Sequence, residues 1–343
     1  MKTPHSLSSG RLIALAGLFS GVALAISPAF GPVDIDTFPA IKNWINAWGT
    51  PRAEWSADER IVSLRFPRVA LAWLAGGCLA CAGAVLQSLL RNSLATPYTL
   101  GVSAAGSFGA FLLFAFPTLA ASLPSAVAPH AIQAAAFLFA LIETLIILAA
   151  AARARHSDTL LLAGVTLNFL FGAGILLIRH LSDPIRLASM DRWLLGSLQD
   201  ASGARAIALA IWVVPGMYLL ARRAPALDQL ALDQELAAAR GISIPTVRRD
   251  LLFGCGILTA AVVAHTGPIG FIGLLVPHAV RPFTGANHTL LLATCWLVGG
   301  GFLVLADLLA RTLPGLGSGV GVPVGIVTAL IGGPLFLWIL FRR

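Results

Sequence analysis

Side chains that could carry chemistry are few in this sequence and stand far apart. Glu143 lies near the middle of an apolar stretch, where a carboxyl group is a candidate proton carrier. Cys78 and Cys81 form a C-x-x-C pair, and His278 follows Pro277, so both places carry residue types that bind metals. None of them has the companion acids, histidines or thiols that such a centre needs. We therefore predict no catalytic residue and no metal site.

Each of these residues also has a structural interpretation. The C-x-x-C pair sits among glycines and alanines, which let helices approach one another closely in a membrane. We expect Glu143 to be neutral and hydrogen-bonded to a neighbouring helix. Gln87 and Asn168 either line a pathway or bond between helices, and the sequence leaves both interpretations open.

The composition places these residues in a membrane. Of the 343 residues, 57% are hydrophobic and 11% are charged, whereas soluble domains carry about 25% charged residues. The mean hydropathy of +0.86 excludes a soluble globule, which could not hide so much apolar surface. The basic residues are dispersed through apolar sequence, so we expect no nucleic-acid partner. All four cysteines lie in apolar stretches, which argues against a secreted disulfide framework.

About 20 apolar residues are needed to cross a bilayer, and this rule gives ten candidate spans in a single domain over residues 1–343. The expected fold is an all-α polytopic membrane protein. The predicted spans are residues 11–30, 67–90, 98–117, 130–152, 158–180, 203–221, 247–266, 270–284, 288–310 and 322–341. Residues 1–30 also fit a signal peptide, because Lys2 and Arg11 precede the apolar run and Ala23-Leu24-Ala25 imitates a cleavage site. An uncleaved first helix gives the better charge balance.

The charge distribution predicts the orientation. With both termini in the cytoplasm, 13 of the 23 basic residues face inside against five of the 15 acidic ones. Residues 31–66 and 181–202 then lie outside. Residues 222–249 form the largest cytoplasmic loop, in which Leu227 to Arg240 is predicted as a short amphipathic helix that ends at Gly241.

ATP hydrolysis is not expected in this chain. Lys2 and Lys42 are its only lysines, and neither follows the glycine pattern of a Walker loop, whose lysine reaches the β and γ phosphates. If ATP drives transport here, a separate subunit must hydrolyse it.

Six sequence blocks stand in a familiar order. Residues 65–102 read RFPRVALAWLAGGCLACAGAVLQSLLRNSLATPYTLGV, and the others are 193–197 (WLLGS), 232–241 (LDQELAAARG), 267–281 (GPIGFIGLLVPHAVR), 306–311 (ADLLAR) and 322–326 (VPVGI). From about residue 60 to the C-terminus, the chain resembles the FecCD/BtuC-type permease subunits of ABC importers for iron–siderophore, haem or vitamin B12. It departs from the family in three places. Asn92-Ser93-Leu94-Ala95 replaces Asn-Pro-Leu-Ala, Asn287-His288-Thr289 replaces Asp-His-Arg, and a glycine-rich run from Gly315 to Gly321 replaces an acidic residue.

The resemblance implies the type II ABC importer permease fold with ten transmembrane helices. It implies a second permease copy in a homodimer, a cytoplasmic ABC ATPase dimer that uses ATP and Mg, and a periplasmic or extracellular substrate-binding protein. No cofactor is expected on this chain. Its place would be the bacterial cytoplasmic (inner) membrane, and its cargo a metal chelate (iron–siderophore or haem) or cobalamin.

The resemblance also assigns roles to residues outside the membrane core. Arg65, Arg68 and Arg311 match arginines that meet acidic side chains of the binding protein, and arginine suits carboxylates because its charged fork is planar. A plainer interpretation is that Arg65 and Arg68 anchor a helix end and that Arg311 pairs with Asp307 at helical spacing.

Two further sets are assigned at the cytoplasmic side. One resembles the family's coupling helix, which fits a groove on the ATPase; it comprises Leu232, Glu235, Ala237, Ala238, Ala239, Arg240 and Gly241. The other matches positions that close the inner end of the pathway; it comprises Asn92, Leu94, Ser157 and Asp158. The coupling set also fits an amphipathic helix on the inner leaflet. Asn92 and Asp158 also fit ordinary helix caps.

Two other functions compete with the importer. A proton-coupled secondary transporter of a small solute needs several intramembrane carboxylates or histidines, and Glu143 alone gives it little support. An intramembrane enzyme needs an acid–base or metal constellation, which the sequence does not offer. The importer alone accounts for the Ala-Arg-Gly segment, the missing Walker lysine and the outer arginines together.

Overall fold

The computed structural model describes residues 8–33, 35–46, 55–125, 127–153, 157–313 and 321–341, and within these ranges the regular structure is entirely helical. The α-helices are α1 (Ser9–Ile26), α2 (Thr37–Asn46), α3 (Ala57–Leu89), α4 (Val102–Ala115), α5 (Pro117–Ala121), α6 (Ala131–Arg153), α7 (Ser157–His180), α8 (Pro184–Leu194), α9 (Gly203–Leu232), α10 (Gln234–Ala239), α11 (Ile244–Thr266), α12 (Ile272–Thr284), α13 (His288–Thr312) and α14 (Val324–Phe341). Two 3-10 turns, Ser27–Ala29 and Ala128–His130, complete them.

Each of the ten predicted spans overlaps at least one of these α-helices. Six helical segments in the described residues are long and apolar enough to cross a membrane: Ser9–Ala29, Ala57–Leu89, Ala128–Arg153, Asp158–His180, Gly203–Leu232 and His288–Thr312. Helix α4 is shorter than expected because residues 96–101 form turns before it. Gly101 then enters the helix at φ +96, a conformation that glycine adopts without strain.

Helix α3 runs through the centre of the bundle and is buried over most of its length. Small residues allow this. A Cβ on Gly76 would lie 2.2 Å from the Gly299 carbonyl oxygen of α13, and one on Gly83 would lie 1.9 Å from that of Gly273 in α12. Cys78 and Cys81 are free, buried thiols in this packed region. The described residues contain no cluster of three or more His, Cys, Asp or Glu that could hold a metal.

Helix α3 also begins ten residues before the predicted span. Ser56 accepts a hydrogen bond from the Glu59 N–H, and the Glu59 carboxylate accepts one from the Ser56 N–H at 2.9 Å. This capping box starts a helix in polar sequence, before the apolar residues begin. Hydropathy alone detects only the apolar part, which is why the prediction began at residue 67.

The predicted amphipathic helix from Leu227 to Arg240 is wrong as one element. Helix α9 continues to Leu232, and Asp233 then takes an extended conformation at φ −153. Its carboxylate accepts hydrogen bonds from the N–H groups of Glu235 and Leu236 at 2.7 and 3.0 Å, so Asp233 ends one helix and caps the next. The separate helix α10 has six residues, and Gly241 follows it at φ +82.

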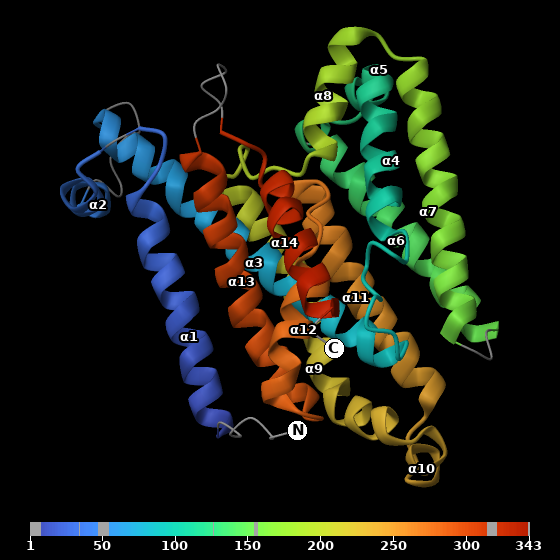
Figure 1. Cartoon of the computed structure of the whole chain (residues 1–343). Helices are drawn as coiled ribbons and strands as arrows, with labels where there is room; N and C mark the ends of the chain where they lie inside the picture. The colour runs from blue at the N-terminus through green and yellow to red at the C-terminus, as the bar shows by residue number, and fades with distance from the viewer. Residues whose placement is uncertain are drawn as a thin grey trace.

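The bundle has two distinct ends (Figure 1). Helix α10 and the start of α1 lie at one end, while α2, α5 and α8 lie at the other. Helix α8 belongs to the predicted outer segment 181–202, and it begins where the Asp183 carboxylate accepts the Arg186 N–H at 3.0 Å. The candidate residues therefore divide between an α8 end and an α10 end.

Candidate functional site

The α8 end contains an ion pair between α3 and α13. The Arg68 Nε lies 3.0 and 2.9 Å from the two carboxylate oxygens of Asp307, and its Nη2 lies 2.8 Å from Oδ1. The Asp307 side chain is 1% exposed and that of Arg68 is 20% exposed. This paired geometry satisfies the carboxylate and fixes α3 against α13.

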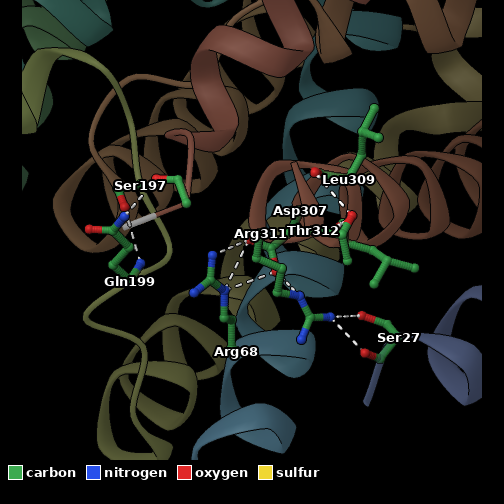
Figure 2. A network of polar contacts seen from close by, with 10 residues as sticks. Ser27, Arg68, Ser197, Gln199, Asp307, Leu309, Arg311 and Thr312 are labelled. Carbon is green, nitrogen blue, oxygen red and sulfur yellow. Dashed lines mark hydrogen bonds and ion pairs between the residues drawn. The ribbon is translucent and has the colours of Figure 1, made fainter. Parts of the chain in front are cut away.

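Arg311 lies on the other side of the same carboxylate (Figure 2). Its Nε is 3.5 Å from Asp307 Oδ2, which makes an ion pair of helical spacing. Its Nη2 donates to the Ser27 carbonyl at 2.7 Å and to the Ser27 hydroxyl. The guanidinium therefore joins α13 to the turn that follows α1, and the whole residue is buried.

Arg65 holds the next part of that turn. Its Nη1 donates to the carbonyls of Pro28 and Ala29 at 2.9 and 3.2 Å, and its Nη2 donates to that of Val33 at 2.5 Å. Arg65 is 6% exposed. Free carbonyls after a helix need donors, and one arginine supplies several of them here.

The three predicted docking arginines are thus brought together, but two of them are buried in internal contacts. All three line one hollow, which Val33 and Gln199 also border. Only Arg68 keeps a partly open side chain. Sequence reasoning anticipated Asp307 as a partner of Arg311. It missed Ser27, which belongs to no motif and accepts through both its backbone carbonyl and its hydroxyl.

At the α10 end, the predicted coupling residues divide by exposure. Leu232, Glu235, Ala238, Ala239, Arg240 and Gly241 are exposed. Ala237 is 1% exposed and packs into the core, so it holds α10 on the bundle and is not available to a partner. Arg240 donates to the Gln229 side-chain oxygen at 2.7 Å, which ties the end of α10 back to α9.

An ion-pair group supports the helices on either side of α10. Arg223 on α9 donates through Nε and Nη2 to one oxygen of Asp250 on α11, at 2.9 and 2.6 Å. Arg249 approaches the other oxygen at 2.9 Å. Helices α9 and α11 are therefore linked across the segment that contains α10.

The predicted gate residues are placed on two elements. Asn92 forms a tight turn after α3, in which its Oδ1 accepts the Leu94 N–H at 2.8 Å, and the Leu94 side chain is 51% exposed. Arg91 enters this turn at φ +49 and donates to the Leu230 carbonyl of α9 at 2.9 Å. Asp158 lies in the first turn of α7, which begins at Ser157. The side chain of Ser157 lies outside the described part of the structure.

A polar contact that sequence reasoning did not find joins four helices near this end. The backbone N–H and the Nδ1 of His288 on α13 lie 2.7 and 2.6 Å from Asp228 Oδ1 on α9. Its Nε2 lies 2.7 Å from the Ser88 hydroxyl of α3, to which Arg281 of α12 donates at 3.0 Å. In the sequence, His288 stood out only within an altered loop motif, because its partners are 60 and 200 positions away.

Glu143 does not have the expected hydrogen bond. The residue is fully buried, and neither carboxyl oxygen has a hydrogen-bond partner among the described residues. The adjacent Thr144 hydroxyl donates to its own helix at the Ala140 carbonyl, at 2.9 Å. Glu143 borders a small cavity with Leu100 and Gly256, so its surroundings are mainly apolar.

The fold and these two ends define a polytopic membrane permease. The FecCD transport family profile matches residues 14–342, and the chain belongs to that family. It is similar to the vitamin B12 import system permease BtuC of Vibrio cholerae, with 39% identity over 86% of this chain and 87% of that one. It is also similar to the hemin transport system permease HmuU of Yersinia pestis, with 37% identity over 82% and 83%.

A solved structure has the same overall fold. It is an inward-facing conformation of a metal-chelate type ABC transporter, and it aligns with a TM-score of 0.81 at 28% identity. The alignment covers 98% of this chain and 100% of that one.

Proposed function

We propose that this chain is the permease subunit of an ATP-driven ABC importer that carries a metal chelate, either an iron–siderophore or haem, or cobalamin, into the cytoplasm. The observation that carries the proposal is near full-length similarity to permeases of vitamin B12 and hemin import systems. Two copies would form the pathway between them. Both termini would lie in the cytoplasm of a bacterial cell, with the chain in its inner membrane.

In this proposal, α10 is the contact with the ATPase dimer, which hydrolyses ATP with Mg. Its exposed face offers small alanines, where a partner can approach closely, bordered by Glu235 and Arg240. The hydrogen bond from Arg240 to Gln229 of α9, together with the Asp233 cap, would make α10 move with α9 as one rigid body.

The substrate-binding protein would dock at the α8 end. Arg68 would be the direct contact there, since its side chain is the one that stays partly open. Arg65 and Arg311 would shape the surface by fixing residues 27–33. At the opposite end, Asn92 and Leu94 with Ser157 and Asp158 would close the pathway, and the bond from Arg91 to α9 would connect that gate to the coupling segment.

The test is reconstitution of the full complex. The chain is expressed with the ATPase and the binding protein that are encoded beside it, and the complex is reconstituted in liposomes. It is then supplied with ferric siderophore, haem or cobalamin. We expect a stable complex and ATP-dependent uptake of one of these cargoes, unaffected when the proton gradient is dissipated. Absence of an associated ATPase, or uptake that follows the proton gradient, would refute the proposal.

A further inference from the structure

A hollow of about 470 Å³ lies between α6 and α9, where both helices pack on α11. Polar side chains gather at one end of it. They come from the turn before α6, from the first turns of α6 and α9, and from the last turn of α11: His130, Gln133, Ser202, Arg205 and His265. All of these elements begin or end here, so this end of the hollow lies at a boundary of the membrane helices.

The rest of the hollow is apolar. Ala134, Ala208 and Ala264 line its walls, and Phe137 on α6 meets Trp212 on α9 at its floor, with ring centroids 4.5 Å apart. Small side chains leave the space open and the two aromatic rings close it. An acyl chain fits such a slot, because it needs no hydrogen bonds and gains from burying methylene groups.

The surface beside the hollow faces lipid. Leu138 on α6 is 53% exposed, and Ile207 and Ile211 on α9 are 64% and 62% exposed. An opening between such faces admits molecules from the bilayer, and a water-soluble ligand would have to cross an apolar surface to enter.

The polar end favours a negative group. Arg205 Nη1 meets the Asp200 carboxylate at 3.7 Å, and the Asp200 side chain is 83% exposed and does not line the hollow. Arg205 Nη2 lies beside Gln133, which also lines the hollow. In the orientation of the Gln133 amide that gives both atoms a partner, its oxygen accepts from Arg205 Nη2 at 3.2 Å and its nitrogen donates to the His130 carbonyl at 3.2 Å. The residues that line the hollow include an arginine and two histidines and no acid.

We propose that this hollow binds one anionic phospholipid, with its phosphate at Arg205 and His130 and an acyl chain along Phe137 and Trp212. The polar end of the hollow lies at the α8 end, but the hollow shares no lining residue with the one that Arg65, Arg68 and Arg311 line. It would tie together the α6 and α9 ends that otherwise meet mainly through α11, and it would make the bundle depend on the lipid composition.

Native mass spectrometry of the full-length chain, purified from mixed phosphatidylglycerol and phosphatidylethanolamine, tests the proposal. We expect phosphatidylglycerol to be retained about fivefold above its share of the mixture, because one arginine attracts its net negative headgroup, whereas the ammonium of phosphatidylethanolamine offsets the charge of that lipid's phosphate. Arg205→Gln should reduce retention to the bulk ratio. Arg192→Gln, an exposed arginine of α8 whose side chain bonds to Ser189, is the matched control and should leave it unchanged.

A second variant tests the apolar part without changing charge. Ala208→Phe should fill the slot and abolish retention in a protein that stays monodisperse. Equal retention of both lipids by the unmodified chain, or an unchanged preference in Arg205→Gln, would overturn the proposal. Full displacement of the lipid by millimolar inorganic phosphate would also overturn it, because the site would then recognise free phosphate and not a lipid.

Discussion

The arginine cluster of the α8 end and helix α10 at the opposite end differ in how their polar groups are used. In the arginine cluster, Arg65, Arg311 and Asp307 are buried and bond to other groups of the same chain. Helix α10 exposes most of its residues and is held by the buried Ala237, the Asp233 cap and the hydrogen bond from Arg240 to Gln229. The arginine cluster therefore holds elements of the chain together, whereas helix α10 presents a surface to which another molecule can bind. A charged residue in the sequence does not reveal which of these roles it has; its burial does.

The largest effect is expected at α10. Ala238→Asp places a charge on the face that we assign to the ATPase, and an uncompensated charge in such a contact weakens binding by at least about 30-fold. Co-purification of the ATPase should be lost and uptake should fall to background. Ala152→Asp, an exposed alanine near the end of α6 at the same end of the bundle, is the control and should retain the ATPase. A fully coupled Ala238→Asp transporter would remove α10 from the interface.

A loss of stability is expected next, at the opposite end. Asp307→Ala removes the carboxylate that pairs with both Arg68 and Arg311. Breaking a buried ion pair lowers the free energy of unfolding by about 3 kcal/mol. The melting temperature of the purified chain should fall clearly. Asp191→Ala removes the carboxylate of an exposed pair with Arg179 and should cost less than about 1 kcal/mol. Equal losses of stability in both variants would show that the Arg68–Asp307–Arg311 cluster does not hold the α8 end together.

The expected effect on docking affinity distinguishes Arg68 from Arg65 and Arg311. Arg68→Gln should weaken binding-protein affinity about tenfold to a hundredfold, the usual range for one charge-assisted contact, with a smaller loss of stability than Asp307→Ala. Arg65→Gln removes the donor to three carbonyls, so stability and docking should fall together. Calorimetric melting and surface binding of the loaded binding protein measure both quantities. Unchanged docking in all arginine variants would place the binding protein elsewhere.

The sequence predicts the all-helical membrane fold well because long apolar stretches indicate helices that cross a bilayer, and six helical segments of the described residues are long and apolar enough to do so. It does worse wherever a local side chain decides the backbone. Ser56 starts α3 early and Asp233 divides α9 from α10, and neither effect is visible in hydropathy. Contacts between distant positions are the hardest to foresee. His288 meets Asp228 and Ser88, and Arg311 meets Ser27, only because the fold brings together segments that no spacing rule connects.

The smallest effect is expected at Glu143, which resembles the α8-end cluster in burial but lacks its partners. A carboxylate without a counter-charge is unfavourable in apolar surroundings, so the residue is expected to be neutral. Glu143→Gln keeps the shape and removes only the ability to ionise; uptake should stay within about twofold, since the difference between two neutral polar groups is small. Glu143→Lys is the contrasting variant, because its longer side chain carries a charge that the surrounding residues cannot pair, and it should prevent folding. If Glu143→Gln abolishes uptake while the protein still melts cooperatively, ionisation of this carboxyl group is part of the transport cycle.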